Sequence, residues 1–179
     1  MKNRFRKEDG FNSGPVQPCP PAGNWVLHSS RCMCCLRMVD GKTSYTSTKT
    51  GRRYKIQRHY TCMTTYCVYL VTCGLCSAQY TGQTTKSMRD RHYGHRSEVK
   101  RKEEGHGEHF HQHAMELGIS MEAAMEYFHL TIIGSVEPGQ PWSKSRLDKL
   151  ESDMMERLMT MQSHGGLNLR VERRRGGGQ

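Results

Sequence analysis

Two strand-like runs joined by a pair of closely spaced cysteines constrain the fold of this chain more than any other feature of its sequence. The first run, residues 68–71, is continuous in β-branched and aromatic side chains, a pattern typical of a buried strand. A second short run follows at residues 79–81. Between them, Cys73 and Cys76 flank a turn that contains a glycine, as in a metal-binding knuckle on a hairpin. The sequence therefore predicts an antiparallel pair of strands with metal ligands at its turn.

The pattern becomes helical after the second strand. Either Thr85 or Ser87 can cap this helix. Residues at spacings of three and four then recur: Met88, Arg91, His95 and Val99. We therefore expect Arg91 and His95 on one face of a helix near residues 85–101.

The cysteine and histidine content favours metal ligation over disulfide bonds. The chain of 179 residues has 8 Cys and 10 His, and its N-terminus lacks the apolar core of a secretory signal. With 35% hydrophobic residues, the core is expected to need help from structural zinc. No apolar run is long enough to cross a membrane, so we expect an intracellular, nuclear protein with no membrane partner. The formal net charge of +10 indicates a polyanionic partner such as DNA.

The composition changes along the chain and suggests four segments. Residues 1–24 are charged and then rich in glycine and proline, which predicts a disordered arm. Residues 25–66 are expected to form a small accessory module with a zinc knuckle and a β-hairpin. Residues 67–170 form the main domain, and residues 171–179 are a basic, glycine-rich tail.

The accessory module carries the ligands of a possible second zinc site. Its expected core is Cys32, Cys35 and Cys62, in which the first two have the spacing of a zinc knuckle. Its fourth ligand stays open among four candidates: His59, Cys34, Cys67 and Cys19.

The same module contains a predicted hairpin of residues 44–48 and 53–57. Cations interleave with tyrosines around it: Lys49, Arg52, Arg53, Lys55 and Arg58. Such a ribbon can lie along a phosphate backbone, although a hairpin edge kept soluble by its charges explains the pattern equally well. The first helix and its approach add further candidates for DNA contact: Lys86, Arg89 and Arg96.

Two histidines complete a zinc-binding pattern with the cysteines of the knuckle. His109 and His113 begin a helix predicted near residues 109–118 and share one face of it. Together with Cys73 and Cys76 they form a two-cysteine, two-histidine set with the spacing of a structural zinc site. The alternative is that they are surface histidines of a polar loop.

The C-terminal part of the domain supplies a third strand and a long helix. Residues 128–136 form an apolar run, preceded by a helical turn that Ser120 can cap. A helix near residues 145–161 has a buried stripe of leucine and methionine, and Glu151 borders it. These elements predict an α/β (α+β) fold, in which a three-stranded antiparallel sheet is flanked by helices and the zinc-binding, β-rich module lies N-terminal to it.

The order of these motifs resembles the GIY-YIG nuclease superfamily. Its signature is two strand tyrosines, here Tyr69 and Tyr80, followed by a helix arginine, here Arg91. The sequence YLVTCGLCSAQYTGQTTKSMRDRHYGHRSEV is similar to the endonuclease domain of Penelope-like retroelements, which has a Cys-x-x-Cys between the tyrosines and ends in a glutamate helix and a Gly-Leu-Asn. The resemblance covers roughly residues 60–170. Cys67 departs from it, because the superfamily often has glycine there.

This resemblance implies a metal-dependent DNA endonuclease with the tyrosines, Arg91, His95, Glu151 and Asn168 at its site. Glu151 is a hard oxygen ligand suited to Mg²⁺ or Mn²⁺, and Arg91 offers permanent charge to the scissile phosphate. We favour Tyr69 as the base, since a metal and Arg91 favour its phenolate, with Tyr80 as its partner.

The remaining roles are less constrained. His95 would hold a phosphate or relay a proton. Asn168 either contacts substrate or ties the last turn to the core. Gly82 is expected to provide backbone freedom and a close approach for DNA.

The alternative to an enzyme is a catalytically inactive, zinc-stabilised module that binds nucleic acid or protein. The chain contains no polymerase, so the resemblance implies an excised domain or a stand-alone derivative of a retroelement, whose RNA would be a further partner.

Overall fold

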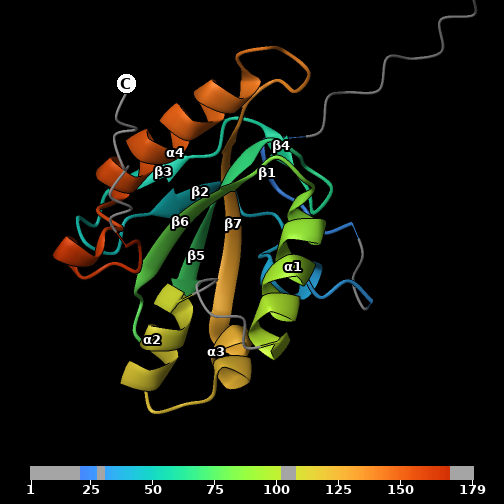
Figure 1. Cartoon of the computed structure of the whole chain (residues 1–179). Coiled ribbons are helices and arrows are strands. Elements are labelled where there is room, and N and C mark those ends of the chain that lie inside the picture. The colour runs from blue at the N-terminus through green and yellow to red at the C-terminus, as the bar shows by residue number, and fades with distance from the viewer. Residues whose placement is uncertain (1–20, 28–30, 102–107, 170–179) are drawn as a thin grey trace, which may run out of the picture.

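Three antiparallel strands form the centre of the computed structural model, which describes residues 21–27, 31–101 and 108–169 (Figure 1). The strands are β5 (Cys67–Cys73), β6 (Gln79–Thr84) and β7 (Phe128–Ser135), and β5 lies between the other two. Every residue from 67 to 71 is buried, because helices cover both faces of this central strand.

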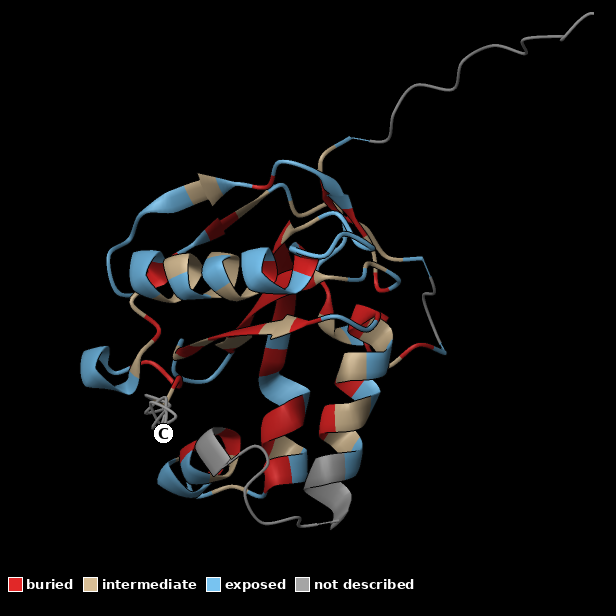
Figure 2. Ribbon diagram, turned by 45° about the horizontal axis from the view of Figure 1, so that its top comes forward, coloured by how far each residue is buried: buried red, intermediate tan, exposed pale blue. Residues whose placement is uncertain are grey.

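The helices lie in two layers, one on each face of the sheet (Figure 2). One layer contains α1 (Met88–Arg101), α2 (Glu108–Glu116) and α3 (Met121–Tyr127), and it covers the face on which Tyr69 projects. The other contains α4 (Ser143–Leu158). This helix packs closely at Gly134 of β7, where an added Cβ would stand 3.0 Å from Leu150 Cδ2. The sheet is therefore enclosed on both sides.

An asparagine side chain covers each outer strand of the sheet. Asn24 exchanges two hydrogen bonds with the backbone of Ile132 in β7, at 2.9 and 2.7 Å. Asn168 does the same with the backbone of Thr81 in β6, again at 2.9 and 2.7 Å. Unpaired strand edges are sites of unwanted pairing with other chains. The two asparagine amides thus satisfy backbone groups at both edges of the three-stranded sheet.

The accessory module packs along β7 and over α4. Its β1 (Gly23–Asn24) pairs in parallel with β4 (His59–Tyr60). The 3₁₀ turn η1 (Cys35–Arg37) contacts β7. The antiparallel hairpin of β2 (Ser44–Thr46) and β3 (Arg53–Lys55) contacts the end of α4. A second 3₁₀ turn, η2 (Gln162–His164), follows that helix.

The α+β class, the antiparallel sheet and the accessory hairpin are confirmed. The predicted strands and helices differ from the observed ones by at most three residues at either end. Local chemistry explains the shorter helices: Ser87 Oγ accepts a hydrogen bond from Asp90 N at 3.1 Å before α1, and left-handed backbone at Met159 ends α4.

The disordered arm predicted over residues 1–24 is wrong at its C-terminal end, because residues 23–24 form the strand β1. Its first 20 residues and the predicted tail, residues 171–179, lie outside the described residues.

Candidate active site and metal centres

Three hydrogen-bonded residues lie on the face of the sheet that α1 covers. Tyr69 projects from β5 and is only 1% exposed. Its hydroxyl oxygen accepts a hydrogen bond from Arg91 Nε at 3.4 Å and lies 3.1 Å from His95 Nε2. Arg91 and His95 reach it together because they lie one turn apart on α1. A cation and an imidazole therefore meet at one phenol.

Tyr80 lies beside Tyr69, and Gly82 makes this approach possible. The two ring centroids are 6.3 Å apart. A Cβ at Gly82 would stand 2.7 Å from the Tyr69 hydroxyl oxygen and 2.6 Å from Tyr80 Cε1. Gly82 is within β6 and its φ is not in the left-handed region, so the reason for glycine is space for two rings. The expected need for backbone freedom is therefore corrected.

Burial raises the pKa of both tyrosine hydroxyls. For Tyr69, burial outweighs the charge and the hydrogen bond of Arg91, which lower the pKa. For Tyr80, burial is reinforced by Tyr69 and by the negative charge of Glu151, and it outweighs the effect of Arg91. The protein alone therefore favours neutral phenols. A base role for Tyr69 depends on the additional charge of a metal.

Glu151 reaches the edge of the sheet from α4 and is held by Gln83. Gln83 Nε2 donates to Glu151 Oε2 at 2.8 Å and to Asp148 Oδ1 at 2.5 Å. Gln83 Oε1 accepts a hydrogen bond from Lys144 Nζ at 3.2 Å, and Lys144 also pairs with Asp148. One amide of β6 thus organises two carboxylates and a lysine of α4.

Electrostatic interactions connect Glu151 to the arginine and the tyrosines. Burial raises the pKa of Glu151 and exceeds the lowering effect of its hydrogen bond from Gln83. The charge of Arg91 also lowers this pKa, while Glu151 raises the pKa of Tyr69 and of Tyr80. The four predicted groups therefore influence one another although they come from β5, β6, α1 and α4.

A groove of about 390 Å³ opens beside this group. Three cations line it, Lys86, Arg91 and Lys144, together with Gln83, Asp90 and the turn that precedes α1. Three cations against one carboxylate give the groove a net positive charge, which suits the phosphates of a nucleic-acid strand.

The other cations assigned to DNA contact lie elsewhere. Five are exposed on and around the hairpin at α4: Lys49, Arg52, Arg53, Lys55 and Arg58. On α1, Arg89 lies 4.0 Å from Asp90 and Arg96 lies 3.6 Å from Glu126. Among the eight cations that the sequence assigned to DNA contact, these seven and Lys86, it is Lys86 that lines the groove beside Arg91.

Asn168 is engaged by the backbone of the sheet. Its side chain is buried, and both of its polar atoms bond to Thr81. This geometry favours the second alternative for Asn168, in which it ties the last turn to the core.

Three residues converge at the β5–β6 turn and fit a structural zinc ion. The ligand atoms of Cys73, Cys76 and His113 all lie within 4.8 Å of one another. Cys76 Sγ and His113 Nε2 are 3.4 Å apart. A tetrahedral zinc with Zn–S of 2.3 Å and Zn–N of 2.0–2.1 Å spans roughly 3.6 Å between such atoms. The other ring nitrogen of His113, Nδ1, lies 3.9 Å from Glu116 Oε2.

The predicted fourth ligand of this centre, His109, belongs to α2 and precedes His113 by four residues. Its side chain lies outside the described residues.

The second cysteine cluster contains Cys32, Cys35 and Cys62. All three are buried, and their sulfur atoms lie within 4.8 Å of one another. Burial would raise the pKa of the Cys32 thiol, but hydrogen bonds from Cys35 and its neighbours outweigh burial and lower it. Burial raises the pKa of the Cys62 thiol to about 12. A bound zinc ion would favour the thiolate, which is the form that binds it. The arrangement of the three sulfur atoms is therefore the observation that fits a metal ion.

The structure shows where each candidate for the fourth ligand lies relative to this cluster. His59 stacks on Trp25, and its Nδ1 lies 3.3 Å from Pro21 O, outside the cluster. Cys34 and Cys67 are buried and lie outside the group of three sulfur atoms. Cys19 lies outside the described residues.

Sequence reasoning missed Gln83, Asp148 and Lys144. The spacing of Lys144, Asp148 and Glu151 by four and three was a usable signal, because it places them on one helix face. No local pattern indicates that Gln83 meets this face, since the contact joins a strand to a helix more than 60 residues later.

Comparison of the chain with protein families, with curated proteins and with solved structures gives no match. Among the helices of the described ranges, none combines the length and apolarity required to span a membrane.

Proposed function

We propose that this protein is a metal-dependent endonuclease that cleaves DNA, and that it is a GIY-YIG enzyme similar to the endonuclease domain of Penelope-like retroelements. The observation that carries the proposal is the convergence of Tyr69, Tyr80, Arg91 and Glu151. These residues come from four elements, and their charges and hydrogen bonds influence one another. Packing alone does not require two tyrosines, an arginine and a carboxylate at one place.

In this proposal, Arg91 binds the scissile phosphate and stabilises the charge that develops on it. Arg91 lines the cationic groove and cannot lose its own charge. Lys86 and Lys144 in the same groove would position the neighbouring phosphates.

The proton leaves the attacking water through Tyr69. His95 Nε2 lies at hydrogen-bonding distance from the Tyr69 hydroxyl and can accept its proton. The resulting phenolate can then accept one proton from water, while Arg91 stabilises it through its hydrogen bond. Tyr80 keeps the Tyr69 ring in place.

Glu151 is the residue that would hold Mg²⁺ or Mn²⁺, and Gln83 fixes the orientation of its carboxylate. When bound, such an ion neutralises phosphate charge and lowers the pKa of a bound water.

The two cysteine clusters would hold zinc for folding alone. Zinc with four protein ligands has no open position for water. The first centre joins the β5–β6 turn to α2 and would hold both tyrosine strands in register.

The burial of Tyr69 favours one alternative, an inactive nucleic-acid-binding module. A side chain that is 1% exposed does not contact bulk water in this conformation.

Incubation of the zinc-loaded protein with supercoiled plasmid and Mg²⁺ separates the two functions. We expect conversion to the nicked circle with wild-type protein, and loss of both nicking and some affinity with Arg91→Ala. Plasmid binding without nicking in Mg²⁺ and in Mn²⁺ would support the inactive module instead.

A further inference from the structure

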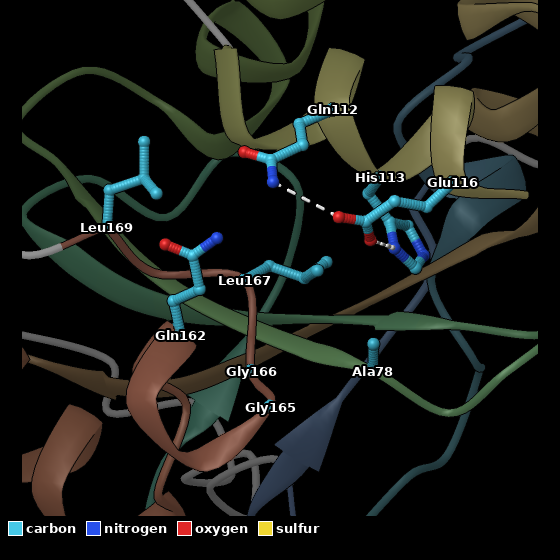
Figure 3. Close-up of a pocket in the computed structure, with 9 residues that line it drawn as sticks. All are labelled: Ala78, Gln112, His113, Glu116, Gln162, Gly165, Gly166, Leu167 and Leu169. Carbon is cyan, nitrogen blue, oxygen red and sulfur yellow. Dashed lines mark hydrogen bonds and ion pairs between the residues drawn. The ribbon is translucent and has the colours of Figure 1, made fainter.

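A second pocket lies between α2 and the loop that follows α4 (Figure 3). It has a volume of about 260 Å³. Its lining combines apolar side chains, two glycines, two amides, the carboxylate of Glu116 and the imidazole of the candidate zinc ligand His113: Ala78, Gln112, His113, Glu116, Gln162, Gly165, Gly166, Leu167 and Leu169. Such a mixture of apolar walls and a few polar groups is typical of a small-ligand site.

This pocket lies next to the tyrosine pair of the candidate active site. Ala78, which lines the pocket, comes directly before β6 and precedes Tyr80 by two residues, a span of at most about 7 Å along the chain. Phe110 of α2 packs on Tyr80 with ring centroids 4.9 Å apart, and the next turn of α2 lines the pocket. A strand of DNA at the tyrosines would therefore pass the pocket within about two nucleotides, given a rise of roughly 3.4 Å per nucleotide.

The pocket is built on a firmly attached loop. Leu167 N donates to Gln79 O of β6 at 2.9 Å. A Cβ at Gly166 would stand 2.1 Å from Thr160 O, so the backbone packs here without room for a side chain. The position of Leu167 relative to β6 is therefore fixed by the fold.

The polar groups of the pocket suit the edge of a nucleobase. Figure 3 shows the Gln112 and Gln162 amides pointing toward one another from opposite sides, with the Leu167 side chain beside Gln162 and below Gln112. An amide offers both a donor and an acceptor, as base edges require, and leucine provides an apolar surface for the base plane. Gln112 Nε2 also donates to Glu116 Oε1 at 3.1 Å, which limits the movement of its side chain.

A lysine lies at the rim of the pocket. A Cβ added at Gly165 would stand 2.7 Å from Lys49 Nζ, so this ammonium group lies directly over the loop. Lys49 can neutralise the phosphate attached to a base in the pocket.

We propose that this pocket binds one unpaired base of the DNA substrate, with Gln112 and Gln162 at the base edge and Leu167 against its plane. The proposal rests on the proposed function only in its choice of DNA as the ligand. A base extruded from a duplex costs less when it is already unpaired, so the protein should prefer DNA with a bulged nucleotide to a fully paired duplex.

Fluorescence anisotropy without Mg²⁺ measures this preference independently of cleavage. We expect the zinc-loaded wild-type chain to bind a duplex with one bulged 2-aminopurine about tenfold more tightly than the matched paired duplex, with a change in 2-aminopurine fluorescence. Gln112→Leu combined with Gln162→Leu should abolish the preference and leave the affinity for the paired duplex unchanged. Ser163→Ala, on the exposed side of the same turn, should behave as wild type.

Equal affinity of wild type for the two duplexes, or a preference that survives in the double variant, would overturn the base pocket. A preference in a protein that does not nick plasmid would retain the pocket and refute the nuclease. Nicking without any preference for the bulged duplex would retain the nuclease and refute the base pocket.

Discussion

Gly82 lies directly opposite Tyr69 in the β5–β6 ladder, and a Cβ at this position would stand 2.7 Å from the Tyr69 hydroxyl oxygen. The same Cβ would stand 2.6 Å from the Tyr80 ring. Neither ring can move far, because Tyr69 is bound by His95 and Tyr80 packs on Phe110. The absence of a side chain at Gly82 therefore leaves the space that the two tyrosine rings occupy.

Gly82→Ala should destabilise the fold and displace both tyrosines. Overpacking of this kind costs about 1–3 kcal/mol, so the melting temperature should fall by several degrees. Gly94→Ala is the matched control, because Gly94 is in α1 and no atom lies within 4 Å of its Cβ position. Alanine there should stabilise the helix by up to about 1 kcal/mol. A thermal melt of Gly82→Ala that matches wild type would refute the packing argument.

Gln83→Leu should impair cleavage more than it impairs DNA affinity. Its amide holds Glu151, and loss of such a partner typically costs about 10–100-fold in activity or metal affinity. Gln83 also lines the groove, but it is uncharged, so the loss of DNA affinity should be smaller than that of Arg91→Ala. The hydrogen bond from Gln83 lowers the pKa of Glu151, which burial raises. The acid limb of the pH–rate profile should therefore move to higher pH in the variant. Thr85→Ala, an exposed neighbour, is the control; an unchanged pH profile in Gln83→Leu would remove Gln83 from the site.

The sequence was sufficient for the elements whose chemistry is local. The β5–β6 hairpin, the shared face of Arg91 and His95 and the Cys73–Cys76 knuckle all follow from alternation or from spacings of two to four residues. His113, 37 residues after Cys76, was assigned to this knuckle from the combination of residue types. The missed features are contacts between distant segments. Asn24 on β7 and Gln83 on α4 each join parts of the chain separated by more than 60 residues, and the contact of Asn168 with β6 was one of two alternatives. No periodicity identifies such partners, because a single amide leaves no pattern.

The protein should bind two zinc ions, and each cluster should lose one independently. Elemental analysis of protein purified without chelator should give about two zincs for wild type and about one for Cys62→Ser or Cys76→Ser. Cys67→Ala should retain two, because Cys67 lies outside both clusters. Retention of both metals in Cys62→Ser would contradict the second site.

His92 should make the fold sensitive to acid. Burial, with the charges of Arg96 and Arg37, lowers the pKa of His92 to about 4, although Glu126 acts in the opposite direction. Because this value lies below the unfolded pKa of about 6.5, the contribution to stability is complete above about pH 6.5 and is lost as the pH falls through about 4. The shift corresponds to about 3 kcal/mol.

Urea unfolding between neutral pH and about pH 4.5 tests this contribution. His92→Leu should lose less stability over this range than wild type, whereas His164→Leu, at an exposed position, should follow wild type. Parallel pH curves for His92→Leu and wild type would exclude the proposed effect.

Glu151→Gln should reduce cleavage without reducing the stability of the fold. Burial raises the pKa of Glu151, so the folded state favours the protonated carboxyl. Its stabilising contribution is present below the unfolded pKa and is lost as the pH rises through the folded pKa. At neutral pH the carboxylate is therefore a cost to stability, which glutamine removes while its Oε1 can still accept the hydrogen bond from Gln83. The melting temperature should be equal to or slightly above that of wild type. Nicking should fall by at least about 100-fold, because the neutral amide is a poor ligand for Mg²⁺.

Asp148→Asn is the matched control on the same face of α4. Asp148 shares the Gln83 amide with Glu151 but also pairs with Lys144, and its loss should reduce nicking much less. Zinc content and affinity for plasmid should stay at the wild-type values in both variants. A Glu151→Gln protein that nicks plasmid at the wild-type rate would falsify the role of Glu151 as the ligand of the catalytic ion, whereas an inactive Asp148→Asn protein would show that both carboxylates hold it.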